Sequence, residues 1–432
     1  MDKKKQIFPN TPSTWIIPSL GFLLAFGLSR WSSSLFPSDI MLESDLWFGA
    51  DIERVILNMT DPLSNYGRAY VHPLFPLLFI PITRPIYFVA SIISDENITA
   101  RIISAQIATS LSAGITWLLL YFISIGFGLK RFQSFAIGLL YLSSASFFFW
   151  WSVPESYPLG SPTIYLPFLL LSSRIKSQKI WLLALIASIS VTVSNFSAGL
   201  IGTFIRFGYR KLFFKLSILA IVATSILFLI QKSYFPSAGS DSNKLSRELK
   251  FVNIFNPAQQ IIYQFFVAPT IPLSPPTLTK KCPTCNVDRL KKGQIDSKGN
   301  QRLQLHYSIP KINEVSILGA LAGITWVFLL LNGLFAILKC PGNKVSIALL
   351  GFVAFELLLH SFYGDSPFLY SAHYNPALIL IAGFGLKRRN SESFRSSLTL
   401  LIIILSSFMM VYNASLLAKA FEIGNLYLNR YK

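Results

Sequence analysis

The chain has 432 residues, of which 52% are hydrophobic and 13% are charged. Because soluble domains carry roughly 25% charged residues, this composition excludes a water-soluble globule, and its apolar content excludes a disordered chain. Uninterrupted apolar runs of about 18 or more residues are frequent, whereas the alternating pattern of a transmembrane barrel is not found. The sequence therefore predicts an all-α polytopic membrane protein.

The net charge is +19, from 38 basic and 19 acidic residues. The basic residues form short groups between apolar runs, such as 3–5, 130–131 and 387–389, rather than one basic face. This pattern follows the positive-inside rule, so membrane lipids are the expected partner and no nucleic acid is expected. The N-terminus is predicted to be cytoplasmic, with the first apolar run kept as a membrane span rather than cleaved as a signal peptide.

Nine single spans are expected along the chain. They lie at about 14–30, 100–129, 134–152, 158–173, 213–231, 315–338, 345–362, 369–386 and 397–415. Two short helices within 180–207 bring the total to about eleven crossings, which places the C-terminus outside. The composition agrees, since 52% of 432 residues fill about eleven spans of about 20 residues.

Two apolar segments need separate interpretation. The run 71–93 contains four prolines, so it is predicted to be a surface-lying or re-entrant element rather than a span. The run 180–207 is either one span, which would put Arg206 and Arg210 outside, or a hairpin of two short helices turning near residues 194–196. Each half of the hairpin is only about 20 Å long, below the roughly 30 Å of the bilayer core. The positive-inside rule nevertheless favours the hairpin.

The spans divide the chain into three parts. An N-terminal membrane module covers 1–232 and includes the first outer loop, residues 31–99. A long extracytoplasmic loop follows at 233–314, and the C-terminal helices cover 315–432.

The first outer loop gathers acids that are candidates for catalysis. Glu43, Asp45 and Asp51 lie within nine residues of one another. A carboxylate beside an apolar wall can act as a base near neutral pH. Asp51 and Arg54 are three residues apart, which on a helix predicts an ion pair. The alternative is a solvated loop whose acids balance Arg54 and Arg68.

The order of elements carries a family resemblance. An opening span is followed by an acidic outer loop, a His72-Pro73-Leu-Phe element, and a helix that begins Ala100-Arg101-Ile-Ile-Ser. This order, with the short hairpin at 180–207, resembles the GT-C glycosyltransferase superfamily, notably the branch of protein O-mannosyltransferases and lipid A aminoarabinose transferases. The resemblance implies a GT-C bundle with juxtamembrane helices in its first outer loop.

The resemblance also implies an activity. The active site would open on the outer face and move a sugar from a polyprenyl-phosphate donor to a glycan, lipid or protein acceptor. Asp45 matches the family's catalytic acid best, with Asp51 and Glu43 as rivals.

The departing phosphate of such a donor needs cations or hydrogen-bond donors around it. The candidates are Arg68, His72, Arg101, His373 and Tyr374. His373 and Tyr374 take the place where the family has an Arg- or Tyr-bearing stretch, although His373 is equally interpretable as an interfacial histidine satisfied by backbone. Glu155, in the second outer loop, stands where related enzymes carry an Arg-x-Tyr element.

Glu356 and His360 are four residues apart in an apolar span, so they share a helix face. A charged group in the membrane is costly enough to suggest function, and the alternative is a neutral hydrogen-bonded pair that locks two helices. The functional interpretation leads to a rival hypothesis, a secondary transporter. A non-catalytic membrane partner in envelope polysaccharide assembly is a third hypothesis.

Cysteine and metal chemistry are expected to be minor. Cys282 and Cys285 lie in the long outer loop, where an oxidising compartment favours a disulfide between them. The sequence predicts no metal site, although a divalent metal cofactor remains possible, and no other cofactor is expected.

Overall fold

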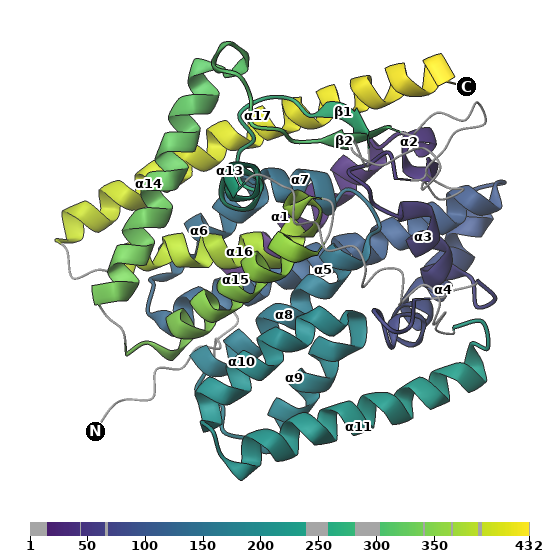
Figure 1. The fold of residues 1–432 in the computed structure, drawn as a ribbon, viewed down its shortest axis with the longest axis horizontal. Coiled ribbons are helices and arrows are strands. Elements are labelled where there is room, and N and C mark those ends of the chain that lie inside the picture. Colours follow the sequence, from purple (N-terminus) through teal and green to yellow (C-terminus); the bar gives the residue numbers. More distant parts are fainter. Residues whose placement is uncertain are drawn as a thin grey trace.

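The computed structural model describes residues 15–43, 45–64, 68–238, 258–280, 303–339, 342–363, 366–387 and 391–431. In these ranges the chain is largely helical, and its strands form one two-stranded hairpin (Figure 1). Six of the described helices are long and apolar enough to cross a membrane: α4 (Phe75–Ile93), α5 (Asn97–Phe127), α11 (Lys211–Tyr234), α14 (Ile317–Lys339), α15 (Lys344–Phe362) and α17 (Glu392–Tyr431). The expectation of a helical membrane protein is therefore confirmed at this level, while the eleven crossings stay a prediction.

In the described residues of the N-terminal half of the chain, the regular elements are helices. They are α1 (Ile16–Ser34), α2 (Ser38–Leu42), α3 (Ile52–Thr60), α4 (Phe75–Ile93), α5 (Asn97–Phe127), α6 (Arg131–Ser143), α7 (Ala145–Trp150), α8 (Ser156–Ser172), α9 (Gln178–Val191), η2 (Val193–Asn195), α10 (Phe196–Phe207) and α11 (Lys211–Tyr234).

The C-terminal half contains the two strands and four long or buried helices. Its elements are α13 (Ala258–Ile262), η3 (Tyr263–Val267), β1 (Thr277–Lys280), β2 (Leu303–His306), η5 (Ile312–Glu314), α14 (Ile317–Lys339), α15 (Lys344–Phe362), η6 (Pro367–Tyr370), α16 (Ser371–Gly383), η7 (Phe384–Lys387) and α17 (Glu392–Tyr431). The strands are antiparallel, with Thr277 opposite His306.

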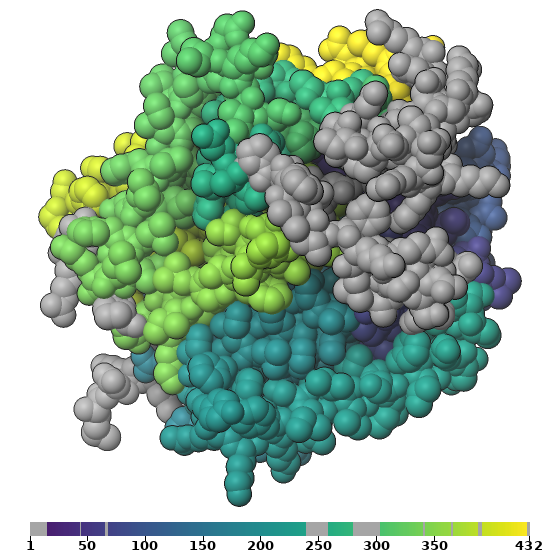
Figure 2. Space-filling view, in the orientation of Figure 1, coloured from purple at the N-terminus to yellow at the C-terminus, as the bar shows by residue number. Residues whose placement is uncertain are grey.

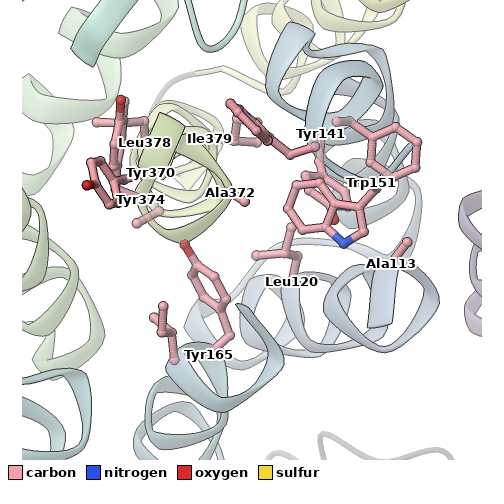
Figure 3. Close-up of a cluster of buried hydrophobic side chains, with 14 of the residues drawn as sticks. Ala113, Leu120, Tyr141, Trp151, Tyr165, Tyr370, Ala372, Tyr374, Leu378 and Ile379 are labelled. Atoms are coloured by element: carbon pink, nitrogen blue, oxygen red, sulfur yellow. The ribbon is translucent and has the colours of Figure 1, made fainter. Parts of the chain in front are cut away.

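The core is built around α5 and α16. Every residue of α16 is buried, and Figure 3 shows it facing aromatic and aliphatic side chains that include Leu120, Tyr141 and Tyr165. Trp117 of α5 is fully buried, and a Cβ on Gly21 of α1 would come within 1.9 Å of its ring. Small residues thus allow α1 to approach α5 closely. The helices α11 and α14 lie at the surface (Figure 2). They expose many apolar side chains, as expected of helices that face lipid.

The span expected at 134–152 is broken, so the prediction of one continuous helix was wrong. Ser144 is extended, with ψ 150°, and its hydroxyl caps α7 by accepting from the Phe147 N–H. The Ala145 and Ser146 N–H groups donate to the carbonyls of Thr270 and Pro269, at 3.0 and 2.7 Å. Because these distant carbonyls replace the helical partners, the break is stable although Ser144 lies within an apolar run.

The last helix is much longer than the span expected at 397–415. α17 has 40 residues, or about 60 Å, which is twice the roughly 30 Å of a bilayer core. Its C-terminal part packs on the first outer loop, where the ring of Phe421 lies 4.9 Å from Phe36 and 5.6 Å from Trp47. α17 therefore serves both as a candidate span and as a cover for that loop.

The proline-containing run 71–93 forms one unbroken helix, α4, from Phe75 onward. Gln231 of α11 forms two side-chain hydrogen bonds at the beginning of this helix. It accepts from the Leu77 N–H at 3.1 Å and donates to the Pro73 carbonyl at 2.9 Å. The helix is long and apolar enough to span, which differs from the expectation of a poor span. Its orientation along the membrane surface stays a prediction.

The run 180–207 is a pair of short helices, as the charge pattern favoured. α9 and α10 have 14 and 12 residues and are separated by η2. They pack closely, since a Cβ on Gly199 would lie 2.5 Å from the Ser188 Oγ and one on Gly202 would lie 3.3 Å from the Trp181 ring. The helical hairpin is thus confirmed, and its membrane topology remains to be measured.

We expect the end of this hairpin to lie in the cytoplasm. In a chain whose three cysteines are replaced by serine, Leu63→Cys should react with a membrane-impermeant maleimide in intact cells, whereas Tyr209→Cys should react only after permeabilisation. These side chains are 78% and 79% exposed, so both are accessible to the reagent. Labelling of Tyr209→Cys in intact cells would show that 180–207 crosses the membrane once.

The described part of the long outer loop is inserted into the molecule rather than lying on its surface. Phe265 of η3 stacks on Tyr374 of α16, with ring centroids 3.9 Å apart. The Leu305 N–H of β2 donates to the Leu46 carbonyl, at 2.9 Å, which joins this loop to the first outer loop. Cys282 and Cys285, for which a disulfide is predicted, lie outside the described residues.

Candidate functional site

The carboxylate of Asp51 lies between two arginines. Asp51 precedes α3, and its Oδ2 accepts from the Nε and Nη2 of Arg54 at 3.2 and 3.1 Å. The Nη2 of Arg68, from the following loop, is 3.2 Å from the same oxygen. The predicted Asp51–Arg54 pair is thus present, and Asp51 also pairs with Arg68, as expected of a loop whose acids balance Arg54 and Arg68. All three side chains are 25% to 31% exposed, so a polar ligand can reach them.

Glu155 lies beside this group at the beginning of α8. Its Oε1 accepts from the N–H and the hydroxyl of Ser156 at 2.8 and 2.7 Å. Its Oε2 is buried and has no hydrogen-bond partner among the described residues. Burial raises the pKa of Glu155, the positive charge of Arg54 opposes the rise, and Asp51 adds to it. A carboxyl group of this kind can exchange a proton closer to neutral pH than an exposed glutamate.

His72 is a neutral imidazole in this environment. Its Nδ1 is 2.9 Å from the Val191 carbonyl of α9, to which it donates, and 3.1 Å from the Thr192 hydroxyl. Burial, together with the smaller effect of the positive charge of Arg54, lowers the pKa of His72 to about 3. The sequence suggested His72 as a ligand of the donor phosphate. The structure disfavours a cationic role, because burial among arginines keeps the ring uncharged.

The depressed pKa of His72 predicts a pH-dependent stability. Between about pH 3 and the ordinary value of 6.5 the unfolded chain binds a proton that the folded chain does not. Stability should therefore fall as pH decreases below about 6.5. We expect His72→Gln to remove on the order of 2 kcal/mol of this loss at about pH 5. Thermal unfolding of both proteins at about pH 7.5 and about pH 5 measures it, and parallel losses would contradict the assignment.

His373 approaches the same region from α16. A Cβ on Gly160 of α8 would lie 2.7 Å from the Asn195 Nδ2, 3.4 Å from the His373 Nε2 and 3.4 Å from the Val191 Cγ1. Because His72 donates to the carbonyl of Val191, this junction brings His72 and His373 into one neighbourhood. The His373 Nε2 and the Asn195 Oδ1 are both buried without a partner among the described residues. His373 thus has a backbone partner, the carbonyl of Tyr157, as the interpretation of a histidine satisfied by backbone expected, while its Nε2 has none among the described residues.

Aromatic rings link this junction to the pair in α15. The ring of Tyr157 lies 5.3 Å from His373 and 4.8 Å from Tyr370. Tyr370 in turn stacks on His360 at 3.9 Å. The His360 Nε2 and the Glu356 Oε2 are 3.0 Å apart and buried, as their spacing predicted.

Tyr374 and Arg101, the two other predicted phosphate ligands, form hydrogen bonds or ion pairs with other residues. The hydroxyl of Tyr374 donates to the carbonyls of Gln264 and Pro367, at 3.1 and 2.9 Å, within the core. A donor phosphate would have to compete with these two carbonyls for the hydroxyl of Tyr374. Arg101 pairs with Asp61 at 3.1 Å, so a donor phosphate would have to compete with that carboxylate.

Asp45, the expected catalytic acid, lies in a strained turn. Asp45 and Phe48 both have left-handed backbone conformations, with φ of 63° and 53°, which cost roughly 1–2 kcal/mol each for residues other than glycine. The turn is held by Trp47, whose Nε1 donates to the Phe149 carbonyl at 3.1 Å. Glu43 directly precedes this turn. Asp51 is the acid of the three for which the described residues give contacts with two arginines.

Sequence reasoning missed Asn195 and Gly160, although a polar residue within an apolar hairpin was a usable signal. Among the described residues, no three His, Cys, Asp or Glu side chains are grouped as a metal site. No protein-family model matches the chain, and no curated protein is significantly similar to it in sequence.

Proposed function

We propose that this protein is an integral-membrane glycosyltransferase that moves a sugar from a polyprenyl-phosphate donor to an acceptor on the extracytoplasmic face. The observation that carries the proposal is the carboxylate of Asp51 held between Arg54 and Arg68 beside the buried Glu155. This arrangement supplies a base for the acceptor and cations for the phosphate within one group of side chains. The GT-C-like order of elements is the second support.

The chemistry assigns a role to each side chain. The donor phosphate competes with Asp51 for Arg68 and Arg54, and its binding releases the Asp51 carboxylate. Asp51 then takes the proton of the acceptor hydroxyl while the acceptor oxygen bonds to the anomeric carbon. The bond from that carbon to the phosphate oxygen breaks, and its electron pair leaves with the phosphate. The two arginines stabilise the charge that develops on this leaving group.

Glu155 and the Gly160 junction extend the proposed site inward. The unpartnered Glu155 Oε2, Asn195 Oδ1 and His373 Nε2 offer hydrogen-bonding positions beyond the ion pair. A sugar carries several hydroxyl groups, which can donate to such acceptors. The proposed membrane orientation, with the N-terminus inside and the C-terminus outside, puts these groups on the outer side.

Proteoliposomes that contain the purified full-length chain test the proposal. A radiolabelled polyprenyl-phosphate sugar should lose its label to water-soluble or lipid acceptors from a membrane extract, at a rate proportional to the amount of protein. The rival transporter hypothesis, which the buried Glu356–His360 pair motivates, predicts solute accumulation driven by an ion gradient. Uptake without transfer would favour the transporter. The absence of both activities would favour the non-catalytic assembly partner.

A further inference from the structure

Three helices extend from the candidate site to a second polar region. α8 begins next to Glu155 and has 17 residues, so its far end is about 25 Å away. α15 runs in the opposite direction, from Lys344 to the turn that carries His360. α16 begins near His373 and continues through η7 to Lys387. Together with α10, which packs against α8 and α15 (Figure 1), these ends enclose a space.

That space is a basic cavity of about 570 Å³. Four cationic side chains line it: Arg174, Arg206, Lys344 and Lys387. An adjoining cavity of about 420 Å³ shares Arg206 and Lys344 and adds Arg210. Among the described residues, no carboxylate lines either cavity, and Arg174, Arg206 and Lys344 form no ion pair. The positive charge of these three side chains is therefore not balanced by the described part of the protein.

Arg174 reaches the cavity through a backbone conformation that is unfavourable in free energy. The Arg174 and Ile175 N–H groups donate to the carbonyls of Leu171 and Leu170, each at 3.1 Å, which closes the end of α8. The residue after the cap of such an ending is usually glycine, but here it is arginine with φ 55°. This left-handed conformation costs roughly 1–2 kcal/mol for a residue with a side chain.

Two further features make the cavity attractive to an anion. Lys344 is the first residue of α15, where the helix dipole already supplies positive charge and disfavours a cation. The Nε of Arg206 is buried and has no hydrogen-bond partner among the described residues. An anion with several acceptor oxygens would satisfy the arginine and offset both positive charges.

We propose that this cavity is a binding site for a phosphate group, with Arg206 and Lys344 as its principal ligands. The phosphate belongs either to the headgroup of an anionic lipid in the cytoplasmic leaflet or to a soluble phosphate compound. The side chains of Phe127, Ile205 and Phe207 also line the two cavities, which suits a lipid whose chains leave toward the bilayer. The proposal is independent of the transferase activity proposed above.

Thermal unfolding of the detergent-solubilised full-length protein tests the site. Titration with dioctanoyl phosphatidylglycerol should raise Tm, whereas dioctanoyl phosphatidylcholine should not. The Lys344→Gln variant should need about fivefold more of the anionic lipid for the same shift, and Lys344→Gln with Arg206→Gln about thirtyfold more. Lys344 is exposed, so its single substitution is compatible with folding even if the double variant fails to fold.

Matched variants and ligands distinguish the outcomes. Lys179→Gln removes an exposed cation from the start of α9 that lines neither cavity, and it should leave the lipid response unchanged. Lys344→Arg should retain the response because it preserves the charge. An equal Tm shift with inorganic phosphate would identify a soluble phosphate compound as the ligand, and a shift with the anionic lipid alone would identify the headgroup. A missing shift in the native protein, or an undiminished response in Lys344→Gln, would overturn the proposal.

Discussion

Asp51→Asn is expected to lower the rate of sugar transfer by about 10²–10⁴-fold, the range that a general base contributes. The amide has nearly the same shape as the carboxylate but cannot accept the proton of the acceptor hydroxyl. It also removes the negative charge that Arg54 and Arg68 share, so donor binding should be retained or strengthened. Single-turnover transfer in proteoliposomes, with donor binding measured separately, distinguishes a loss of chemistry from a loss of binding.

Glu53→Gln is the matched control for this experiment. Glu53 lies in the first turn of α3, two residues after Asp51, but is exposed, so its substitution should leave transfer within about twofold of the native rate. Full activity of Asp51→Asn would exclude Asp51 as the base. Asp45→Asn and Glu43→Gln would then identify which remaining acid takes that role, and full activity in all three variants would refute the outer-loop base.

Gly333→Ala is expected to reduce stability strongly. Gly333 lies in α14 where that helix crosses α16, and a Cβ there would come within 2.1 Å of the Ile381 carbonyl oxygen and 2.8 Å of the Ala382 Cα. Both are backbone atoms, so no side-chain rotation can relieve the contact and the helices must separate. Overpacking of this kind costs about 1–3 kcal/mol. We expect Tm to fall by roughly 5 °C in thermal unfolding of the detergent-solubilised protein.

Gly27→Ala provides the control for this change. A Cβ on Gly27 of α1 would have no neighbour within 4 Å, and alanine favours a helix over glycine by about 1 kcal/mol. Its Tm should therefore remain equal to or slightly above that of the native protein. Equal Tm values for Gly333→Ala and the native protein would mean that α14 and α16 are not in close contact.

Local sequence patterns predicted much of the fold because hydropathy and charge are properties of short segments. The apolar runs predicted the positions of α5, α11, α14 and α15 to within a few residues. The cations around 206–211 predicted that 180–207 forms a hairpin, and α9 and α10 confirm it. The spacing of Asp51 and Arg54 predicted their ion pair. Each of these features depends on residues that are neighbours in the chain.

Long-range contacts decided what the local patterns could not. The helix break at Ser144 depends on hydrogen bonds to the carbonyls of residues 269 and 270, more than 120 positions later. No local sequence pattern therefore predicts it. α17 continues beyond its expected end because the first outer loop packs against its second half. The proline-containing α4 is continuous, and Gln231 of α11 provides partners for its first turn.

The same division holds for the candidate site. The sequence by itself determined the class of protein, the acid-rich segment 31–99 and the set of polar residues from which a site could form. The tertiary structure decided which of these groups meet, since it placed Arg68 on Asp51, brought Glu155 within reach of their charges and buried His72 in a neutral state. The physical reason is that ion pairing and desolvation depend on distances between chain-distant groups, which composition and spacing do not specify.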